Sequence, residues 1–499
     1  MMKLMVQDLL KLVTFLALVR LTITSPGKVN FGYCEKIVKT WSNSAVNQEA
    51  KVDRHTLQDL LFFLHVPRTG GRAYFHCFLK KLYSSSQECP RSYDKLRFNP
   101  SKTKCRLLVT HDDYSMMSKL PKERTSLVTI LRNPVDRVFS SYEFSVEVAA
   151  RFLVHPNLTS ATQMAKQLRS KAKGVSTLDI WPWKYLVPWM REDLFARRDA
   201  RRQDGLSDVE GNDPYDMEEV VMPLHDYIND AIARDIIHNG ATLQIAGLTN
   251  NSYYDGAHEV RHCIIEFKEL GVHVLEVAKR RLDEMLYVGL TEDHRESATM
   301  FANVVGAQVI SQLRSRSPVP ETVAAKRTSE QSSTMYSESM DRHDQNGTLD
   351  EEVNGIHAPG NVEANKENMT VTKLIKAYES CIHPLRSIQS RRRISSLKHI
   401  APANFTKEAR LHVSEAVLQE IKSFNSLDLE LYEYARKIFS NQHKRTAQKL
   451  LTTESFGDIV SSSFSISPWS LILVAAPIFL LVLFIFVVIK GKRISKIKI

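Results

Sequence analysis

Short apolar runs separated by helical patterns of hydrophobic and polar positions occupy the first half of the chain. Three runs, at residues 61–66, 106–110 and 127–131, are each followed by a polar loop or helix. Runs of this length with little alternation are typical of strands buried on both faces of a sheet. Their alternation with helical patterns predicts an α/β fold, with a parallel sheet flanked by helices, over residues 57–312.

The second half of the chain changes in composition. Residues 313–370 are rich in Ser, Glu, Asn and Thr and contain a single aromatic residue, Tyr336, which predicts a disordered polar insert. Beyond it, residues 405–439 carry apolar side chains along a helical face. We therefore expect the chain to return over residues 371–445 and complete the same domain. Residues 25–56 form an N-terminal lead-in.

An uncharged apolar stretch lies near the C-terminus, at residues 470–489. Its 20 residues match the length that a helix needs to cross a bilayer, so we expect a transmembrane helix over residues 469–489. A Ser/Thr-rich stalk, residues 446–468, precedes it. The basic tail, residues 490–499, carries five Lys or Arg residues, and the positive-inside rule places it in the cytosol. The rest of the chain then faces a lumen, as in a type I membrane protein.

This topology requires an N-terminal signal peptide, which we expect at residues 1–24. Its apolar run, residues 9–19, is too short to span a bilayer, and Lys11 interrupts the run, so that an uncleaved anchor is the alternative. Glycosylation sequons support lumenal exposure of the body. Five occur before the transmembrane segment, at Asn157, Asn250, Asn346, Asn368 and Asn404.

Composition and charge narrow the class of protein. With 43% hydrophobic and 25% charged residues, the chain has the balance of a globular protein. The formal net charge of +11 would favour nucleic acid, but the basic tail holds five of these charges and the signal segment holds two. Only +4 remains for residues 25–489, so we expect no nucleic-acid partner.

Six cysteines are too few for a disulfide scaffold in a chain of 499 residues, and their spacing predicts no zinc site. They are Cys34, Cys77, Cys89, Cys105, Cys263 and Cys381. In an oxidising lumen we expect one to three disulfides. Cys89 and Cys105 are the local pair to test first, whereas Cys77, on an apolar stretch, is expected to be a buried thiol.

The first apolar run leads directly into the loop HVPRTGGR, residues 65–72, and then into a helical pattern over residues 73–82. A strand, a glycine turn and a helix start expose backbone N–H groups that bind phosphate or sulfate. Arg68 can contact two oxygens of such an anion, and the Thr69 hydroxyl can donate one more hydrogen bond. The alternative is a tight turn with a surface arginine. The sequence has no GxxxxGK[ST] motif, which disfavours an ATPase.

The third apolar run ends in LRNPVDRVFSS, residues 131–141, where Asn133 and Pro134 predict the start of a helix. Arg132 stands at the end of the strand, and Ser140 follows a little over two helical turns later. Both can reach one phosphate placed beside that helix. The sequence therefore predicts a second anion-binding loop as a companion to the first.

The two loops together resemble the cofactor loops of the sulfotransferase family. The resemblance implies a P-loop-like sulfotransferase fold, 3′-phosphoadenylyl sulfate as the sulfate donor, and no metal. The first loop would hold the 5′-phosphosulfate of the donor and the second loop its 3′-phosphate. The residues assigned to the first loop are Arg68, Thr69, Gly70, Gly71 and Arg72, and those assigned to the second are Arg132 and Ser140.

Three further segments, FFLHVPRTGG, LTEDHRES and SLDLELYEYARKIF, resemble the heparan sulfate 6-O-sulfotransferase branch. The C-terminal anchor is instead similar to the tyrosylprotein sulfotransferases of plants, and Arg68 replaces the lysine of the glycan enzymes. This resemblance implies a Golgi membrane enzyme that sulfates tyrosine hydroxyls of secreted peptides with acidic flanks. A carbohydrate sulfotransferase, a lumenal cargo receptor and, less favoured, a Golgi glycosyltransferase are the alternatives.

His111 follows the second apolar run and aligns, by the same resemblance, with the general base of the 6-O-sulfotransferases. A tyrosine hydroxyl, whose pKa is about 10, needs a proton acceptor as its oxygen attacks sulfur. A neighbouring carboxylate, from Asp112 or Asp113, could fix the tautomer of the ring. The alternative is that His111 only caps the strand. Glu143 is the competing base, and a solvated helix position is its simpler interpretation. Arg68 would offset charge on the leaving phosphate oxygen.

An acceptor with acidic flanks requires a basic groove. Arg391, Arg392 and Arg393 are one candidate, although a run of charges is usually a solvated face. The aromatic stretch WPWKY, residues 181–185, could line the groove, with core packing as the simpler explanation.

Overall fold

The computed structural model describes residues 30–47, 55–90, 99–100, 104–161, 163, 192–203, 213–216, 222–231, 233–316, 369–397 and 405–461. The chain divides into two compact units, Met1–Gln442 and His443–Ile499. The strands of the described residues all belong to the first unit, and the fold described below is the fold of that unit.

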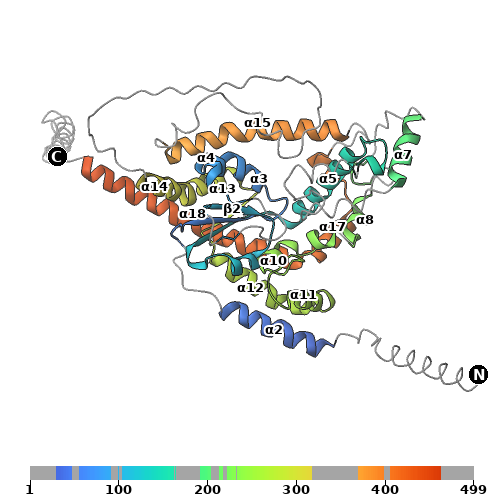
Figure 1. The fold of residues 1–499 in the computed structure, drawn as a ribbon, viewed down its shortest axis with the longest axis horizontal. Coiled ribbons are helices and arrows are strands. Elements are labelled where there is room, and N and C mark those ends of the chain that lie inside the picture. The colour runs from blue at the N-terminus through green and yellow to red at the C-terminus, as the bar shows by residue number, and fades with distance from the viewer. Residues whose placement is uncertain are drawn as a thin grey trace, which may run out of the picture. The chain divides into compact units, whose positions relative to one another are not determined.

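A parallel sheet of four strands forms the centre of the first unit (Figure 1). Its strands are β1 (Leu60–Leu64), β2 (Leu107–Thr110), β3 (Thr125–Leu131) and β4 (Tyr287–Leu290), in the order β2-β1-β3-β4. The predicted α/β fold and its three predicted strands are confirmed. The fourth strand was not predicted, because a run of only four residues that includes a glycine does not stand out from the helical patterns around it.

The register of the sheet brings the loops after the strands together. Leu64, the last residue of β1, lies opposite Thr110 of β2 and Thr129 of β3. Every residue of β1 and β3 is buried, as expected for central strands covered on both faces. Since parallel strands end at one edge of a sheet, the loops after β1, β2 and β3 all meet at the carboxyl edge.

Helices cover both faces of the sheet (Figure 1). One layer contains α10 (Gly240–Ile245), α11 (Ala257–Glu266), α12 (Gly271–Asp283) and, packed on the last two, α2 (Phe31–Asn47). The other layer contains the helical run α3–η1–α4 (Gly71–Tyr74, Phe75–Leu79 and Lys80–Leu82), α13 (His294–Phe301), η8 (Ala302–Gly306), α14 (Ala307–Arg316) and α15 (Val371–Leu397). The helical pattern predicted after the first loop is thereby confirmed.

A second, smaller core lies around α5 (Pro134–Phe152), the helix that follows β3. Its inner face, with Val138, Phe139 and Tyr142, packs against residues of several short helices. These helices are α7 (Glu192–Gln203), α8 (Leu224–Asn229), α9 (Arg234–Ile237), α16 (Lys407–Leu411) and α17 (Glu415–Phe424). Residues from the C-terminal part of the chain therefore contribute to this core.

The described residues from 405 to 461 form three helices. Helices α16 and α17 are followed by α18 (Ser426–Ser461), and side chains of Thr406 and Ser414 cap the starts of the first two. From His443 onward α18 belongs to the second unit. The predicted stalk begins at residue 446, and its residues 446–461 lie in this helix.

Several predicted segments lie outside the described residues. They are the signal peptide at 1–24, most of the insert at 313–370, the transmembrane helix at 469–489, the tail at 490–499 and the aromatic stretch at 181–185. Within the ranges described here, no helix combines the length and the apolar character needed to cross a membrane.

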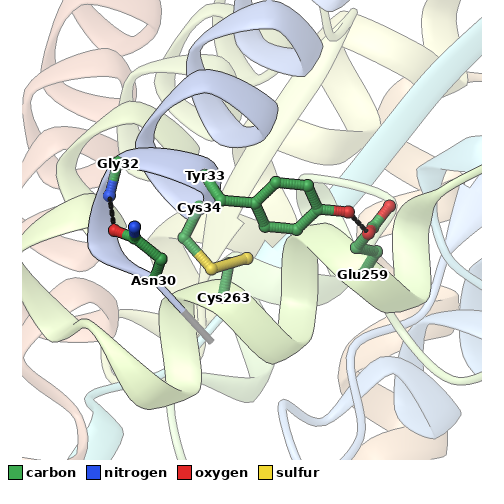
Figure 2. Close-up of a disulfide and its surroundings, with 6 residues drawn as sticks. All are labelled: Asn30, Gly32, Tyr33, Cys34, Glu259 and Cys263. Atoms are coloured by element: carbon green, nitrogen blue, oxygen red, sulfur yellow. Dashed lines mark hydrogen bonds between the residues drawn. A yellow bond between two sulfur atoms is a disulfide. The ribbon is translucent and has the colours of Figure 1, made fainter. Parts of the chain in front are cut away.

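All six cysteines form disulfides. The predicted local pair, Cys89–Cys105, is confirmed, and Cys34–Cys263 joins α2 to α11 (Figure 2). The prediction of a buried Cys77 thiol was wrong, because Cys77 is bonded to Cys381 of α15. Burial was anticipated correctly, but the partner lies 304 residues away in sequence, where no local pattern indicates it.

Tyr33 makes a second contact beside the Cys34–Cys263 bond by donating from its hydroxyl to Glu259 of α11 (Figure 2). A side-chain hydrogen bond and a disulfide thus both hold α2 against the layer below the sheet.

Candidate active site

The loop after β1 bends sharply through left-handed backbone conformations. Arg68 adopts a φ of 68° and Gly70 a φ of 81°. The Thr69 hydroxyl, which is buried, donates to the Val66 carbonyl at 2.8 Å and stabilises the bend from inside. This hydroxyl is therefore engaged within the loop. An anion bound at the turn would accept hydrogen bonds from the backbone N–H groups rather than from the Thr69 side chain.

Gly71 begins the helix after the loop and requires the absence of a side chain. A Cβ atom built there would lie 2.3 Å from Cδ2 of His65, far inside van der Waals contact. The N–H groups of the first helical turn have no acceptor within the helix. Glycine therefore allows the helix N-terminus to approach His65 and the carboxyl edge closely, as an anion-binding turn requires.

Arg68 joins the two predicted anion loops. Its Nε and Nη2 atoms donate to Ser140 Oγ of α5 at 3.1 and 3.0 Å. Its guanidinium lies 4.2 Å from the centre of the Phe144 ring. Burial, followed by the positive charge of Arg393, lowers the pKa of Arg68 to about 10, so the side chain remains protonated at neutral pH. Arg68 and Ser140, predicted in separate loops, thus belong to one cationic site.

Arg132 completes this site from the end of β3. Its Nη1 atom donates to the Arg68 carbonyl at 3.2 Å, and burial lowers the pKa of the side chain. Its Nε atom is buried and has no hydrogen-bond partner among the described residues. A buried donor without an acceptor is costly unless a ligand supplies one, so this atom fits a phosphate oxygen.

The second loop starts its helix as the sequence predicts. The Asn133 side chain accepts from the N–H groups of Val135 and Asp136 at 3.0 and 3.4 Å, and Pro134 is the first helical residue. Thr291, after β4, was missed by the sequence analysis. Its hydroxyl lies 2.7 Å from the Thr69 carbonyl and 3.0 Å from the Leu131 carbonyl, so that it connects the two loops.

His111 lies at the end of β2 with its ring held by the main chain. Its Nδ1 atom is 2.8 Å from the His65 carbonyl oxygen. Because a carbonyl oxygen can only accept, Nδ1 carries the proton of the neutral ring and Nε2 carries the lone pair. A proton acceptor in this tautomer suits general-base catalysis.

The two carboxylates beside His111 accept hydrogen bonds from other groups. Asp112 accepts from the hydroxyl of Thr110 at 2.8 Å, and Asp113 accepts from Ser115 and Thr249. Both aspartates are buried, and Asp113 joins the segment after β2 to the segment after α10. The His65 carbonyl fixes the proton on Nδ1 of His111, a contact that sequence spacing does not reveal.

His65 packs its ring against that of His111, with 4.3 Å between the ring centres. Burial lowers the pKa of His65 well below its ordinary value, and electrostatic interactions with His111, Arg68 and Arg72 lower it further. His65 is therefore neutral in the folded protein. Arg72, predicted to bind the donor, stands half-buried in α3, where its charge acts on His65.

Glu143, the competing base, lies in a buried ion-pair cluster. Its carboxylate accepts from the Tyr215 hydroxyl at 2.9 Å, from Arg410 Nε at 3.0 Å and from Arg393 Nη1 at 3.3 Å. The side chain is 3% exposed, so the interpretation as a solvated helix position was wrong. With both oxygens engaged by cations, Glu143 is a weaker candidate for the base than His111.

The arginines predicted for the acceptor groove take part in the same cluster. Arg393 pairs with Glu143 and Glu147 at 3.3 Å, and Arg392 lies 3.8 Å from Glu147. Arg391 is exposed. Much of the positive charge of this run is thus offset by buried carboxylates of α5. In the part of the chain that is described, no group of three or more His, Cys, Asp or Glu side chains could hold a metal ion.

A parallel sheet flanked by helices, with arginines of two loops and an oriented histidine at its carboxyl edge, has the features of an enzyme that acts on anionic groups. No protein-family model matches the chain. The chain is 56% identical to the protein-tyrosine sulfotransferase of Arabidopsis thaliana over 502 residues, which cover 98% of this chain and 99% of that protein. It belongs to the protein-tyrosine sulfotransferase family, and the resemblance found in its sequence is confirmed.

Proposed function

We propose that the protein transfers the sulfuryl group of 3′-phosphoadenylyl sulfate to tyrosine hydroxyls of secreted peptides and proteins. The observation that carries the proposal is the contact of Arg68 with Ser140, which unites both anion loops, beside a histidine with its lone pair on Nε2. The similarity to the protein-tyrosine sulfotransferase supports the tyrosine acceptor.

The residues present fit the donor. The turn at Arg68–Arg72, with its helix N-terminus and with Gly71 against His65, would hold the 5′-phosphosulfate. Arg132, whose buried Nε needs an acceptor, and Ser140 would hold the 3′-phosphate. Two guanidinium groups from different loops then contact a ligand of high negative charge.

His111 and Arg68 would share the chemistry. Nε2 of His111 accepts the proton of the tyrosine hydroxyl while the tyrosine oxygen forms a bond to sulfur. The bond between sulfur and the bridging phosphate oxygen breaks, and the electron pair leaves with adenosine 3′,5′-bisphosphate. Arg68 stabilises the negative charge that develops on that oxygen. The products are tyrosine O-sulfate and the bisphosphate, with the proton on His111.

We further propose a Golgi membrane location, with the first unit in the lumen and the transmembrane helix at residues 469–489. Three disulfides support an oxidising compartment. Of the five sequons, Asn157 and Asn250 lie among the described residues, and both are exposed. We also propose acceptors with acidic flanks, which the exposed Arg391 of α15 could contact.

A transfer assay tests the function. The full-length protein in detergent is given radiolabelled donor and an Asp-Tyr peptide, with the Asp-Phe peptide as its control and a desulfated glycan as the competing acceptor. We expect label on the tyrosine peptide alone. Label on the glycan alone would replace the proposal with a carbohydrate sulfotransferase, and failure to bind adenosine 3′,5′-bisphosphate would remove the enzyme assignment.

A further inference from the structure

Gln244 joins the ends of two strands at the active site. It lies on α10, and its side chain is fully buried. Its Nε2 atom lies 2.9 Å from the carbonyl of His111, 3.1 Å from that of Asp112 and 3.3 Å from that of His65. One amide group therefore spans the loop after β1 and the loop after β2.

The His65 carbonyl is the point where this amide meets the histidine ring. It accepts from His111 Nδ1 at 2.8 Å and from Gln244 Nε2 at 3.3 Å. A carbonyl oxygen has two lone pairs and can accept both bonds. The orientation of that carbonyl decides which ring nitrogen of His111 holds the proton, and Gln244 holds the carbonyl.

The helix that carries Gln244 is itself anchored. Asp428 of α18 accepts from the N–H groups of Ala241 and Thr242 at 3.2 and 2.7 Å, and from the Thr242 hydroxyl at 2.7 Å. Arg137 of α5 donates to the same carboxylate at 2.8 Å, and both side chains of this ion pair are 1% exposed. The start of α10 is therefore fixed by a buried ion pair between two other helices.

The amide oxygen of Gln244 indicates that this side chain does more than stabilise the fold. It is buried and has no hydrogen-bond partner among the described residues, which costs stability. The comparable residue Gln312 of α14 satisfies both ends of its amide, by donating to the Leu57 carbonyl and accepting from Arg106. Gln312 lies at the opposite edge of the sheet, ahead of β1.

We propose that Gln244 is a positioning residue for the proposed general base. It keeps the His65 carbonyl in place and thereby keeps His111 in the tautomer with its lone pair on Nε2. This inference rests on the proposed function only through the role of His111 as base.

The test is a double-mutant cycle with the full-length protein. Gln244→Met removes the donors and keeps the length of the side chain. We expect kcat to fall about tenfold to a hundredfold, as for a catalytic group moved by a fraction of an ångström to an ångström. The KM for the donor and the affinity for adenosine 3′,5′-bisphosphate should stay within about twofold of the wild type. Gln244 contacts neither Arg68 nor Ser140, which are proposed to bind the donor.

The His111→Ala background separates positioning from structure. If Gln244 acts through His111, the double variant should have the kcat of His111→Ala alone, within about twofold. Multiplication of the two losses would overturn the inference, as would a kcat above half of the wild-type value in folded Gln244→Met. An unchanged kcat in His111→Ala would overturn it together with the base assignment.

Gln312→Met is the matched control, because it removes the same amide far from the site. We expect it to lower the unfolding temperature and leave kcat unchanged, and an equal loss of kcat in both variants would contradict a positioning role. Should Gln244→Met not fold, Gln244→Glu replaces it. Burial favours the protonated carboxyl, which keeps one donor, so its kcat should fall between those of the wild type and His111→Ala.

Failure of this inference is distinguishable from failure of the proposed function. The cycle uses whichever acceptor the wild-type protein sulfates, so a glycan acceptor would refute tyrosine sulfation and leave the role of Gln244 testable. Tyrosine sulfation by the wild type together with a normal kcat in Gln244→Met would refute the positioning role and leave the proposed function intact.

Discussion

The amino edge and the carboxyl edge of the same sheet are built on different principles. At the amino edge, polar groups satisfy one another. Gln308 accepts from the Leu57 N–H at 2.7 Å, and Gln312 donates to the Leu57 carbonyl and accepts from Arg106. Such an arrangement contributes stability and leaves little for a ligand to bind.

At the carboxyl edge, groups are strained or lack partners. Arg68 has a left-handed backbone, Arg132 Nε and Gln244 Oε1 are buried without partners among the described residues, and the lowered pKa of His65 keeps its ring neutral. Each of these features costs free energy of folding. The difference indicates that the carboxyl edge is arranged for ligand binding and that the rest of the fold must offset its cost.

Loss of the buried Asp428–Arg137 ion pair, which anchors the start of α10, should have the largest effect on stability. Asp428→Ala leaves the Arg137 guanidinium buried without its carboxylate and releases the start of α10. We expect the free energy of unfolding to fall by about 3–5 kcal/mol, measured by chemical denaturation. The control Asp59→Ala breaks an exposed pair with Arg124 and should cost less than about 1 kcal/mol. Equal losses in the two variants would contradict this anchor.

Removal of the central cation should abolish activity and leave the fold intact. Arg68→Ala takes away the group that would stabilise charge on the leaving oxygen, a contribution of about 3 kcal/mol, or a hundredfold or more in rate. The measurement is kcat with labelled donor, alongside thermal unfolding. Arg124→Ala, an arginine of the amino edge, should retain wild-type turnover. Folded Arg68→Ala with more than about a tenth of normal turnover would remove this role.

Those features of the carboxyl edge that depend on a few neighbouring residues could be predicted from the sequence. The strand and glycine loop before Arg68 and the capping Asn133 follow rules that span a few residues, and both are present as expected. The two loops, about 60 residues apart, could be assigned to one site only through their resemblance to the cofactor loops of sulfotransferases.

The remaining features depend on contacts between distant segments. Cys77 is bonded to Cys381 of a helix beyond the insert, and Glu143 is buried by Arg393 and Arg410 from the C-terminal part of the chain, so the local sequence indicated neither partner. Thr291 and Gln244 are ordinary polar residues in sequence. Only the folded arrangement places them against loop carbonyls.

The neutral His65 should make the protein sensitive to acid. Its folded pKa is lowered, so below the ordinary value of about 6.5 the unfolded chain binds a proton that the folded protein does not. Stability is therefore fully present above that value and falls as pH decreases, by up to about 1.4 kcal/mol per pH unit for this group. The measurement compares the free energy of unfolding of the wild-type protein at pH 7.5 and at pH 5.5.

His65→Gln should flatten this dependence, whatever its effect on stability at pH 7.5. An unchanged slope in His65→Gln would show that other groups cause the acid sensitivity.

The smallest predicted effects come from the same substitution, serine to alanine, made at each edge of the sheet. This pair compares the two edges directly. Ser126 accepts from the Gln58 N–H at 2.8 Å at the amino edge, and Ser140 accepts from Arg68 at the carboxyl edge. Both serines are largely buried, at 7% and 5% exposure. Ser126→Ala should cost about 1 kcal/mol of stability with kcat/KM for the donor unchanged, since only a structural hydrogen bond is lost.

Ser140→Ala should show the reverse pattern. The Arg68 guanidinium remains packed on Phe144 and can be solvated, so stability should change by less than about 1 kcal/mol, whereas kcat/KM for the donor should fall about tenfold through loss of a phosphate contact. Thermal unfolding and donor titrations on both variants measure the two quantities. If each serine affected stability and donor use to the same extent, the division of the sheet into a structural edge and a ligand-binding edge would not hold.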